Sequence, residues 1–176
     1  MEGKTRESRR CKGDLIMKYF AYGSNMDSQR MKDREVNFSK RELAILKNYE
    51  LCFNKQASSN PNEGYANLIL KEGTATEGIL YEIDESDIEK LDKWEASPNH
   101  YIKKTVKVKL PRGSEVDALV YIAQPDKIKD GLKPTTKYLN HLKEGRDLIS
   151  KRYYNFIKSF DTLEASKQSD VKNKRG

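Results

Sequence analysis

Alternating and continuous apolar segments dominate the middle of this chain and predict a protein built mainly of strands. An apolar run opens at Met17 and stops at Gly23-Ser24-Asn25, which predicts a first strand ending in a turn. Two polar segments predict further turns, Lys71-Glu72-Gly73 between strands and Pro111-Arg112-Gly113-Ser114 within a hairpin. The later strands are expected at Leu43–Asn54, Gly64–Leu70, Ala75–Ile83, Tyr101–Leu110 and Val116–Gln124.

Helical spacing is limited to a few short segments, and the longer ones start from Asp84 onward. Asp84 is placed to cap a helix in which Ile88, Leu91 and either Trp94 or Glu95 share one face. The other helices are expected from Pro134, in the first turn, to His141 and from Ile149 to Phe160.

Several strands with few, unevenly placed helices predict an α+β fold with a mostly antiparallel sheet, which in a chain of this length often closes into a small barrel. The 176 residues favour a single domain. We expect a disordered N-terminal tail at 1–16, a domain at 17–160 and a polar C-terminal tail at 161–176.

Composition indicates the cellular environment in which this domain is expected to function. No apolar run approaches the roughly 18 residues that a membrane helix needs, so no membrane partner is expected. The first residues lack the apolar region of a secretory signal. The two cysteines, Cys11 and Cys52, could pair, but Cys11 lies in the expected tail. A reduced, cytoplasmic chain is therefore the favoured interpretation.

The formal net charge of +7 raises the question of nucleic-acid binding. Most lysines alternate with acids, however, and the basic segment Tyr101–Leu110 has a strand's parity. Lys103, Lys107 and Lys109 share one face, while the apolar residues from Val106 onward share the other. A solvated sheet face explains this pattern better than a nucleic-acid surface, so we expect no nucleic-acid partner.

Several kinds of catalytic or cofactor site are missing from the sequence. The histidines His100 and His141 and the distant cysteines lack the spacing of a zinc site, so no metal is expected. Neither of the common glycine-rich phosphate loops occurs. Ser24 lacks the GxSxG pattern of a serine nucleophile, and a Ser24–His100 pair is a weak alternative.

The loop Gly23-Ser24-Asn25 is the first candidate site. Glycine permits positive φ and close approach to the backbone, and serine and asparagine favour turns. A short helix is expected to follow, starting near Asp27 or Ser28. Unpaired amides at such a turn suit a carboxylate or an oxyanion. From spacing alone, a plain turn whose amides bind water is the stronger alternative.

Glu95 is the second candidate, at the end of the helix that starts near Asp84. The negative end of the helix dipole and burial beside Trp94 would both disfavour its ionisation, so its pKa is expected to be raised. A carboxyl group with a raised pKa suits general acid–base catalysis. The alternative, again favoured by spacing alone, is a surface acid at a frayed helix end.

Together these segments resemble the γ-glutamylcyclotransferase family, including its AIG2-like relatives. The resemblance rests on Tyr19-Phe20-Ala21-Tyr22-Gly23-Ser24-Asn25, Gly78-Ile79-Leu80-Tyr81, Leu91-Asp92-Lys93-Trp94-Glu95 with Tyr101 six residues later, Tyr121 and Tyr138. It spans about Met17 to Tyr154. One departure is Ala96, where the family usually has glycine; if that position needs positive φ, alanine costs around 1 kcal/mol.

The resemblance implies a small mixed β-barrel with flanking helices and an enzyme that needs no metal or cofactor. The implied reaction is a cyclising acyl transfer that releases 5-oxoproline and a free amine or amino acid from a γ-glutamyl compound. Glu95 would be the general acid–base. The implied substrate-binding residues are Tyr19, Phe20, Ala21, Tyr22, Gly23, Ser24, Asn25, Tyr121 and Tyr138.

Three points stay open at this stage. Tyr121 and Tyr138 are equally well explained as core aromatics with satisfied hydroxyl groups. The alternative function is a non-catalytic module that binds γ-glutamyl or amine metabolites on the same fold. The sequence chooses neither the leaving group of the small-molecule substrate nor the oligomeric state, for which a homodimer is one option. The geometric expectation is specific: the amides of Gly23 to Met26 and the Glu95 carboxylate should face one cavity.

Overall fold

The computed structural model of this chain describes residues 15–164. The expected tails at 1–16 and 161–176 fall almost wholly outside the described residues, as does Cys11, so the proposed domain boundaries stay predictions. Among residues 15–164, no helix is long and apolar enough to cross a membrane.

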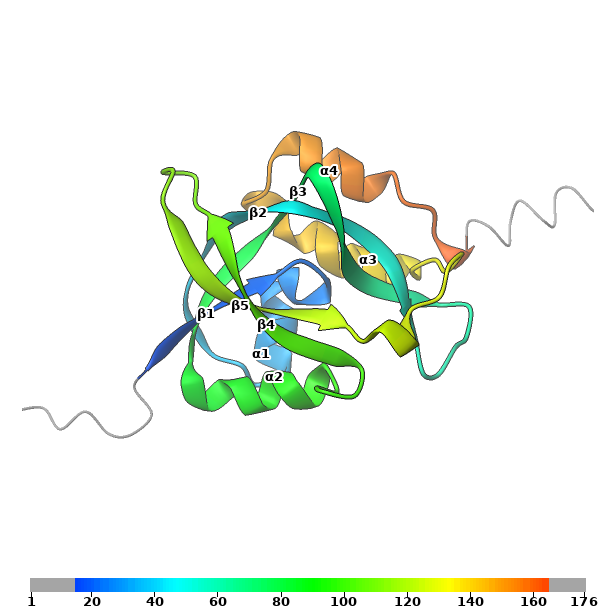
Figure 1. Ribbon diagram of the computed structural model, residues 1–176, viewed down its shortest axis with the longest axis horizontal. Helices are drawn as coiled ribbons and strands as arrows, with labels where there is room; N and C mark the ends of the chain where they lie inside the picture. Colours follow the sequence, from blue (N-terminus) through cyan, green and yellow to red (C-terminus); the bar gives the residue numbers. More distant parts are fainter. Residues whose placement is uncertain (1–14, 165–176) are drawn as a thin grey trace, which may run out of the picture.

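Five strands form a closed barrel in the order β1-β3-β2-β4-β5 (Figure 1). All neighbouring strands are antiparallel except β1 and β5, which close the barrel through a parallel contact. The predicted α+β fold with a mixed, mostly antiparallel barrel is therefore confirmed. The strand bounds are β1 Ile16–Ala21, β2 Phe38–Gln56, β3 Gly64–Asp84, β4 Tyr101–Lys109 and β5 Glu115–Ala123.

The predicted turn at Lys71-Glu72-Gly73 does not separate two strands. These residues belong to β3, which continues along the same partner: Leu70 pairs with Tyr49 of β2, and Ala75 pairs with Lys47. The extra residues form a bulge in the ladder, where the Gly73 amide donates a hydrogen bond to the Asn48 side chain. The local turn signal was correct, but the bulge bends one long strand instead of ending it.

The predicted hairpin across Pro111–Ser114 is present, and β4 has the expected wet face. Val108 is buried, whereas Lys103 and Lys107 are exposed and form ion pairs with Asp92 and Asp117. Lysines that already face acids on a solvated strand support the interpretation of this segment as surface.

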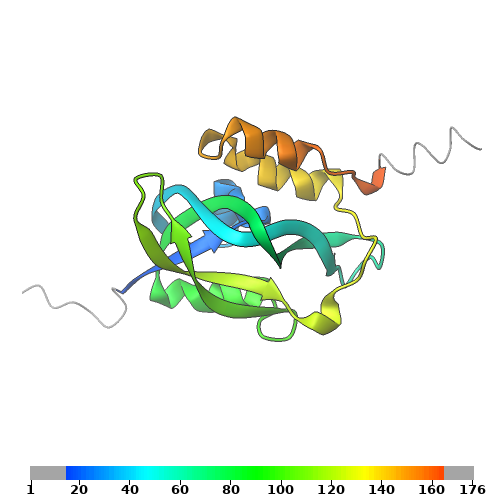
Figure 2. The ribbon, with the colours of Figure 1, turned by 45° about the horizontal axis from the view of Figure 1, so that its top comes forward.

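Short helices cover the barrel. The 3₁₀ turn η1 and helix α1 follow β1, α2 follows β3, and α3 and α4 lie against each other on one side of the barrel (Figure 2). Asp27 caps α1 by accepting from the Gln29 amide, as predicted. The helix bounds are η1 Ser24–Met26, α1 Ser28–Asp33, η2 Glu85–Asp87, α2 Ile88–Trp94, η3 Pro125–Lys127, α3 Thr136–Lys143, η4 Glu144–Asp147 and α4 Lys151–Lys158.

Two predicted helix starts need correction. Asp84 precedes the 3₁₀ turn η2, and its side chain makes no capping hydrogen bond. Pro134 lies before the helix, because Thr135 is the cap of α3 and its hydroxyl accepts from the Tyr138 amide. A threonine oxygen can accept that bond, which proline cannot do.

The end of β1 and the loop that follows it are buried in the hydrophobic core. Tyr19, Phe20 and Ala21 are buried consecutively, so both faces of β1 are covered at its C-terminal end. Gly78 of β3 permits this closeness: a Cβ there would lie 2.6 Å from the Ala21 carbonyl oxygen. Met26 is fully buried. The loop after β1 is therefore a fixed part of the core.

Candidate active site

A cavity of about 250 Å³ opens at the end of the barrel where β1 ends and α2 meets β4. It has polar and aromatic walls contributed by segments that are far apart in the sequence. Its lining residues are Tyr19, Tyr22, Gly23, Ser24, Asn25, Arg30, Arg34, Lys55, Ser58, Tyr65, Ala66, Trp94, Glu95, Ala96, His100, Tyr101, Tyr121 and Tyr138.

Most residues singled out from the sequence meet at this cavity, with clear exceptions. Phe20 and Ala21 lie in the core and do not line it. Met26 does not line it either, and its amide donates to the Gly23 carbonyl at 3.0 Å. Gly23, Ser24 and Asn25 therefore line the same cavity as Glu95, whereas the Met26 amide is engaged within the loop.

Gly23 is needed for space and not for an unusual φ. Its φ is −112°, so the positive φ that glycine permits is not used. A Cβ at this position would lie 3.0 Å from the Ala66 Cβ and 3.3 Å from the Tyr138 hydroxyl. Within residues 15–164, the amides of Ser24 and Asn25 have no hydrogen-bond acceptor. They remain available to a ligand.

Two arginines that the sequence reasoning missed fix the side chains of this loop. The Arg30 Nε donates to the Ser24 Oγ at 3.0 Å, and the Arg34 Nη1 donates to the Asn25 Oδ1 at 2.9 Å. Burial, followed by the nearby Arg34, lowers the pKa of Arg30. The four-residue spacing of these arginines in α1 and its cap, directly after the loop, was the available signal.

The cavity wall made by Ser24, Asn25, Arg30 and Arg34 is called the loop side below. Its hydrogen bonds extend outward, because the Arg30 Nη1 lies 3.4 Å from the His141 Nε2 and the His141 Nδ1 lies 2.8 Å from the Asp27 Oδ2. Since Ser24 Oγ accepts from Arg30 and no hydrogen bond joins it to His100 within the described chain, the Ser24–His100 nucleophile has no geometric support.

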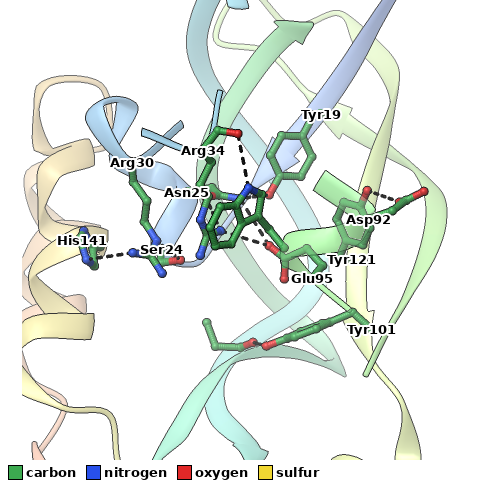
Figure 3. A network of polar contacts seen from close by, with 12 residues as sticks. Tyr19, Ser24, Asn25, Arg30, Arg34, Asp92, Glu95, Tyr101, Tyr121 and His141 are labelled. Carbon is green, nitrogen blue, oxygen red and sulfur yellow. Dashed lines mark hydrogen bonds and ion pairs between the residues drawn. The ribbon is translucent and has the colours of Figure 1, made fainter. Parts of the chain in front are cut away.

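Glu95 ends α2, and its carboxylate points into the cavity toward Asn25 and Arg34 (Figure 3). Its Oε1 lies 3.4 Å from the Asn25 Nδ2 and 3.9 Å from the Arg34 Nη1, and 18% of its side-chain surface is exposed. Burial raises the pKa of Glu95, while Arg34, Arg30 and Lys55 act in the opposite direction. The predicted direction of the pKa shift is thus obtained from burial.

Trp94 does not supply that burial. It is 55% exposed, and the Arg34 guanidinium lies 4.9 Å from the centre of its ring. The indole therefore covers the arginine that faces Glu95, and its Nε1 also donates to the Arg34 carbonyl at 3.4 Å.

Ala96 occupies the strained conformation that the sequence comparison with the family anticipated. Its φ is +48°, in the left-handed region that favours glycine. The Ala96 amide still donates to the Lys93 carbonyl at 3.2 Å, so the strain accompanies a closed helix end. The backbone directly after Glu95 is therefore held at a cost by the surrounding structure.

The tyrosines of the cavity have protein partners as well as cavity exposure. The Tyr121 hydroxyl donates to the Asp92 Oδ1 at 2.6 Å. The Tyr138 hydroxyl accepts from the Ala66 amide at 3.1 Å, which leaves its own proton to donate. Burial raises the pKa of Tyr138 to about 12, so the group is neutral at physiological pH. The Tyr22 hydroxyl donates to the Tyr121 carbonyl.

The opposite wall, called the strand side below, contains Lys55, Tyr65, His100 and Tyr101. Lys55 is only 3% exposed, and its ammonium lies 5.4 Å from the Tyr65 ring centre and 5.6 Å from that of Tyr101. The sequence reasoning missed this lysine. The signal was its parity, because Lys55 continues the buried face of β2 that contains Leu51 and Phe53.

Among residues 15–164, no group of histidine, cysteine and acidic side chains is arranged to hold a metal ion. What the cavity does offer is a carboxylate with a raised pKa, free backbone amides on the loop side and cations on both walls. This combination can move protons and hold anionic groups beside them.

Known proteins show similarity at the levels of family and fold. The sequence model of the family described as gamma-glutamyl cyclotransferase, AIG2-like, matches residues 19–141. No curated protein matches the chain significantly.

Solved structures share the fold. An uncharacterized human protein is 22% identical, with a TM-score of 0.74. The match covers 84% of this chain and 89% of the human chain. A gamma-glutamyl cyclotransferase is 21% identical with a TM-score of 0.74 and the same coverage. YkqA from Bacillus subtilis is 25% identical, with a TM-score of 0.72. The match covers 85% of this chain and 56% of the YkqA chain.

Proposed function

This chain belongs to the γ-glutamyl cyclotransferase, AIG2-like family, and from that premise we propose that it is a cyclotransferase acting on a small γ-glutamyl compound. The reaction releases 5-oxoproline and a free amine or amino acid. The observation that carries the proposal is that the Glu95 carboxylate and the Gly23–Asn25 loop line one cavity although they are distant in the sequence.

The chemistry is an intramolecular aminolysis. The α-nitrogen of the glutamyl group attacks its own γ-carbonyl carbon, and the bond between that carbon and the leaving nitrogen breaks. The α-ammonium loses one proton before attack and a second as it becomes the lactam nitrogen. The leaving nitrogen gains one proton when its bond breaks and another when it becomes an ammonium ion. Protons are thus only relocated, and closure is fast once the chain is held in position.

Glu95 is the group proposed to relocate these protons. As a carboxylate it accepts a proton from the α-ammonium, and as a carboxylic acid it delivers one to the leaving nitrogen. Burial raises its pKa, which makes it a better base than an exposed glutamate, while Arg34 limits that rise. One carboxyl group therefore serves both steps without a cofactor.

The loop side is proposed to bind the glutamyl part of the substrate. The amides of Ser24 and Asn25 are free for the γ-carbonyl oxygen as it becomes an oxyanion. Arg30 and Arg34 provide positive charge for the α-carboxylate. Tyr138 has a hydroxyl proton to donate, whereas the Tyr121 proton is engaged with Asp92. Tyr138 is therefore the better of the two tyrosine candidates.

The test replaces Glu95 by glutamine and measures 5-oxoproline from a panel of γ-glutamyl compounds. Glutamine keeps the shape and the hydrogen bond from Asn25 but cannot carry the proton, so turnover should fall roughly 10²–10⁴-fold. The matched control is Glu89→Gln, an exposed acid on the same helix, which should behave as the wild type. Full turnover by Glu95→Gln would rule out this mechanism.

The same panel separates the enzyme from a binding module. Calorimetry that shows tight binding of γ-glutamyl compounds to the wild type without any 5-oxoproline would favour the non-catalytic alternative. The cytoplasmic location, the lack of nucleic-acid partners and the oligomeric state stay predictions from the sequence.

A further inference from the structure

Lys55 on the strand side has an environment that differs from that of every other cation lining the cavity. Arg30 and Arg34 each donate a hydrogen bond to a loop side chain. Lys55 is 3% exposed, and among residues 15–164 its ammonium has no hydrogen bond and no carboxylate within ion-pair distance. Only two aromatic rings face it, each at more than 5 Å. A buried ammonium without an anion is costly to keep.

A second polar group on the strand side is also unpartnered. The His100 Nδ1 is buried and has no hydrogen-bond partner in the described part of the chain. Burial and the nearby Lys55 both lower the pKa of His100, so the ring is neutral and has one N–H to donate. Within the described residues, the Lys55 ammonium therefore lacks an anion and the His100 Nδ1 lacks a hydrogen-bond partner, and both groups line the same cavity.

Lys55 also lies within electrostatic range of the reacting centre. Burial, followed by Lys127, lowers the pKa of Lys55, and the Glu95 carboxylate acts in the opposite direction; burial raises the pKa of Glu95, and Lys55 acts against that rise. Because Lys55 and Glu95 line the same cavity of about 250 Å³, an anion on Lys55 would share that small space with the nitrogen that Glu95 protonates. That requirement restricts where the negative charge can be on the leaving group.

Resting on the proposed cyclotransferase function, we propose that Lys55, assisted by His100, binds the carboxylate of the leaving group. The preferred substrate is then a γ-glutamyl α-amino acid, in which the carboxylate is one carbon away from the leaving nitrogen. A γ-glutamyl amine lacks this carboxylate. In a γ-glutamyl group on the ε-nitrogen of lysine, or on a dipeptide, the carboxylate is several bonds farther away. Those compounds leave Lys55 without its anion.

The test compares γ-glutamylalanine with γ-glutamylisopropylamide, which replaces the alanine carboxylate with a methyl group. We expect the wild type to favour γ-glutamylalanine in kcat/KM by about ten- to hundredfold, since a charged hydrogen bond is lost with the amide. In Lys55→Met, which keeps length without charge, this ratio should fall close to one. Lys55→Arg should retain most of the ratio.

The control is Lys129→Met, an exposed lysine outside the cavity lining, which should keep the wild-type ratio. If Lys55 served only to hold the fold, Lys55→Met would lower the rates for both compounds equally, and the inference would be wrong. A wild-type ratio near one would overturn it as well. Thermal unfolding checks that each variant is folded.

Failure of the inference can be told apart from failure of the proposed function. The two compounds are also titrated calorimetrically into Glu95→Gln and into the double variant Glu95→Gln/Lys55→Met. This measures the carboxylate preference without turnover. If no 5-oxoproline forms but the binding ratio depends on Lys55, the carboxylate site stands and the reaction is wrong. If 5-oxoproline forms with no such preference, the reaction stands and the carboxylate site is wrong.

Discussion

The two walls of the cavity differ in how their polar groups are satisfied. On the loop side, the side chains of Ser24, Asn25, Arg30 and Arg34 are joined by hydrogen bonds of 2.9 to 3.0 Å. On the strand side, Lys55 faces two aromatic rings and a histidine nitrogen stays unpaired. Both walls are buried and positively charged, so burial alone does not explain the difference.

The difference indicates a division of labour around Glu95. A cross-linked wall is already in place before a substrate binds, which suits the precise positioning that ring closure needs. A wall with unpaired groups gains its missing partners only from a ligand, which suits discrimination between substrates. The predictions below test this contrast, beginning with the largest expected effect.

The largest effect should follow from removing a cross-linked group on the loop side. Asn25 is 2% exposed and bonds to Tyr19, Arg34 and Glu95, so Asn25→Leu leaves several buried groups unpaired. We expect the free energy of unfolding to fall by about 2–4 kcal/mol, since each unpaired group costs roughly 1–3 kcal/mol. Urea denaturation measures the change.

Two further substitutions are compared with Asn25→Leu, one on the protein surface and one on the strand side of the cavity. Asn140→Leu replaces an exposed asparagine of α3 and should change stability by less than about 0.5 kcal/mol. Lys55→Met removes an unpaired buried charge and should leave stability equal or higher. If Lys55→Met were as destabilising as Asn25→Leu, the contrast between the two walls would be lost.

A smaller effect, with a signature in pH, is expected from Arg34→Met. Arg34 lowers the pKa of Glu95, so its removal should raise that pKa further. Glu95 acts as a base only above its pKa, and the acidic limb of the kcat/KM profile should therefore move to higher pH. We also expect about a tenfold loss at the optimum, from the broken bond to Asn25.

The pH profile of 5-oxoproline release measures this shift. Arg112→Met is the control, because Arg112 lies in the β4–β5 turn and pairs with Glu42 on the surface. Its profile should match the wild type. An unshifted acidic limb in Arg34→Met would mean that Glu95 is not the titrating base.

The smallest effect is expected at Ala96, which follows the acid shared by both walls. Its left-handed φ costs about 1–2 kcal/mol for a residue with a Cβ. Replacement by glycine removes this cost, but about 0.4–1 kcal/mol of the gain is lost because glycine has more conformational freedom in the unfolded chain. Ala96→Gly should therefore raise the free energy of unfolding by about 1 kcal/mol or less, with turnover near that of the wild type.

Thermal and urea unfolding measure this gain. The control Ala44→Gly should lower the free energy of unfolding. Ala44 is fully buried in β2 and has an ordinary φ, so the loss of its methyl group removes packing without relieving strain. A loss of stability in Ala96→Gly would show that the methyl group of Ala96 contributes packing that outweighs the strain.

Local patterns in the sequence predicted most of the barrel. The strands, the hairpin at Pro111–Ser114 and the Asp27 cap follow from neighbours a few residues apart, and they are present. Where the prediction failed, at the bulge Lys71–Gly73 and the helix start at Pro134, the same local signal had more than one structural outcome. Pairing with β2 and the Thr135 cap selected between them.

Tertiary structure alone decided which side chains share the cavity. Closure of the barrel brings Asn25 to Glu95, 70 residues away in the chain, and aligns the end of β2 with the start of β4. Phe20 belongs to the same motif as Asn25 but is fully buried within β1, whereas Asn25 lies in η1 beyond the end of that strand and lines the cavity. The sequence by itself determined most of the elements, because these depend on local periodicity, whereas Glu95 is favoured over a surface acid only by the resemblance to the family. The cations around that acid depend on contacts that exist only once the barrel has closed.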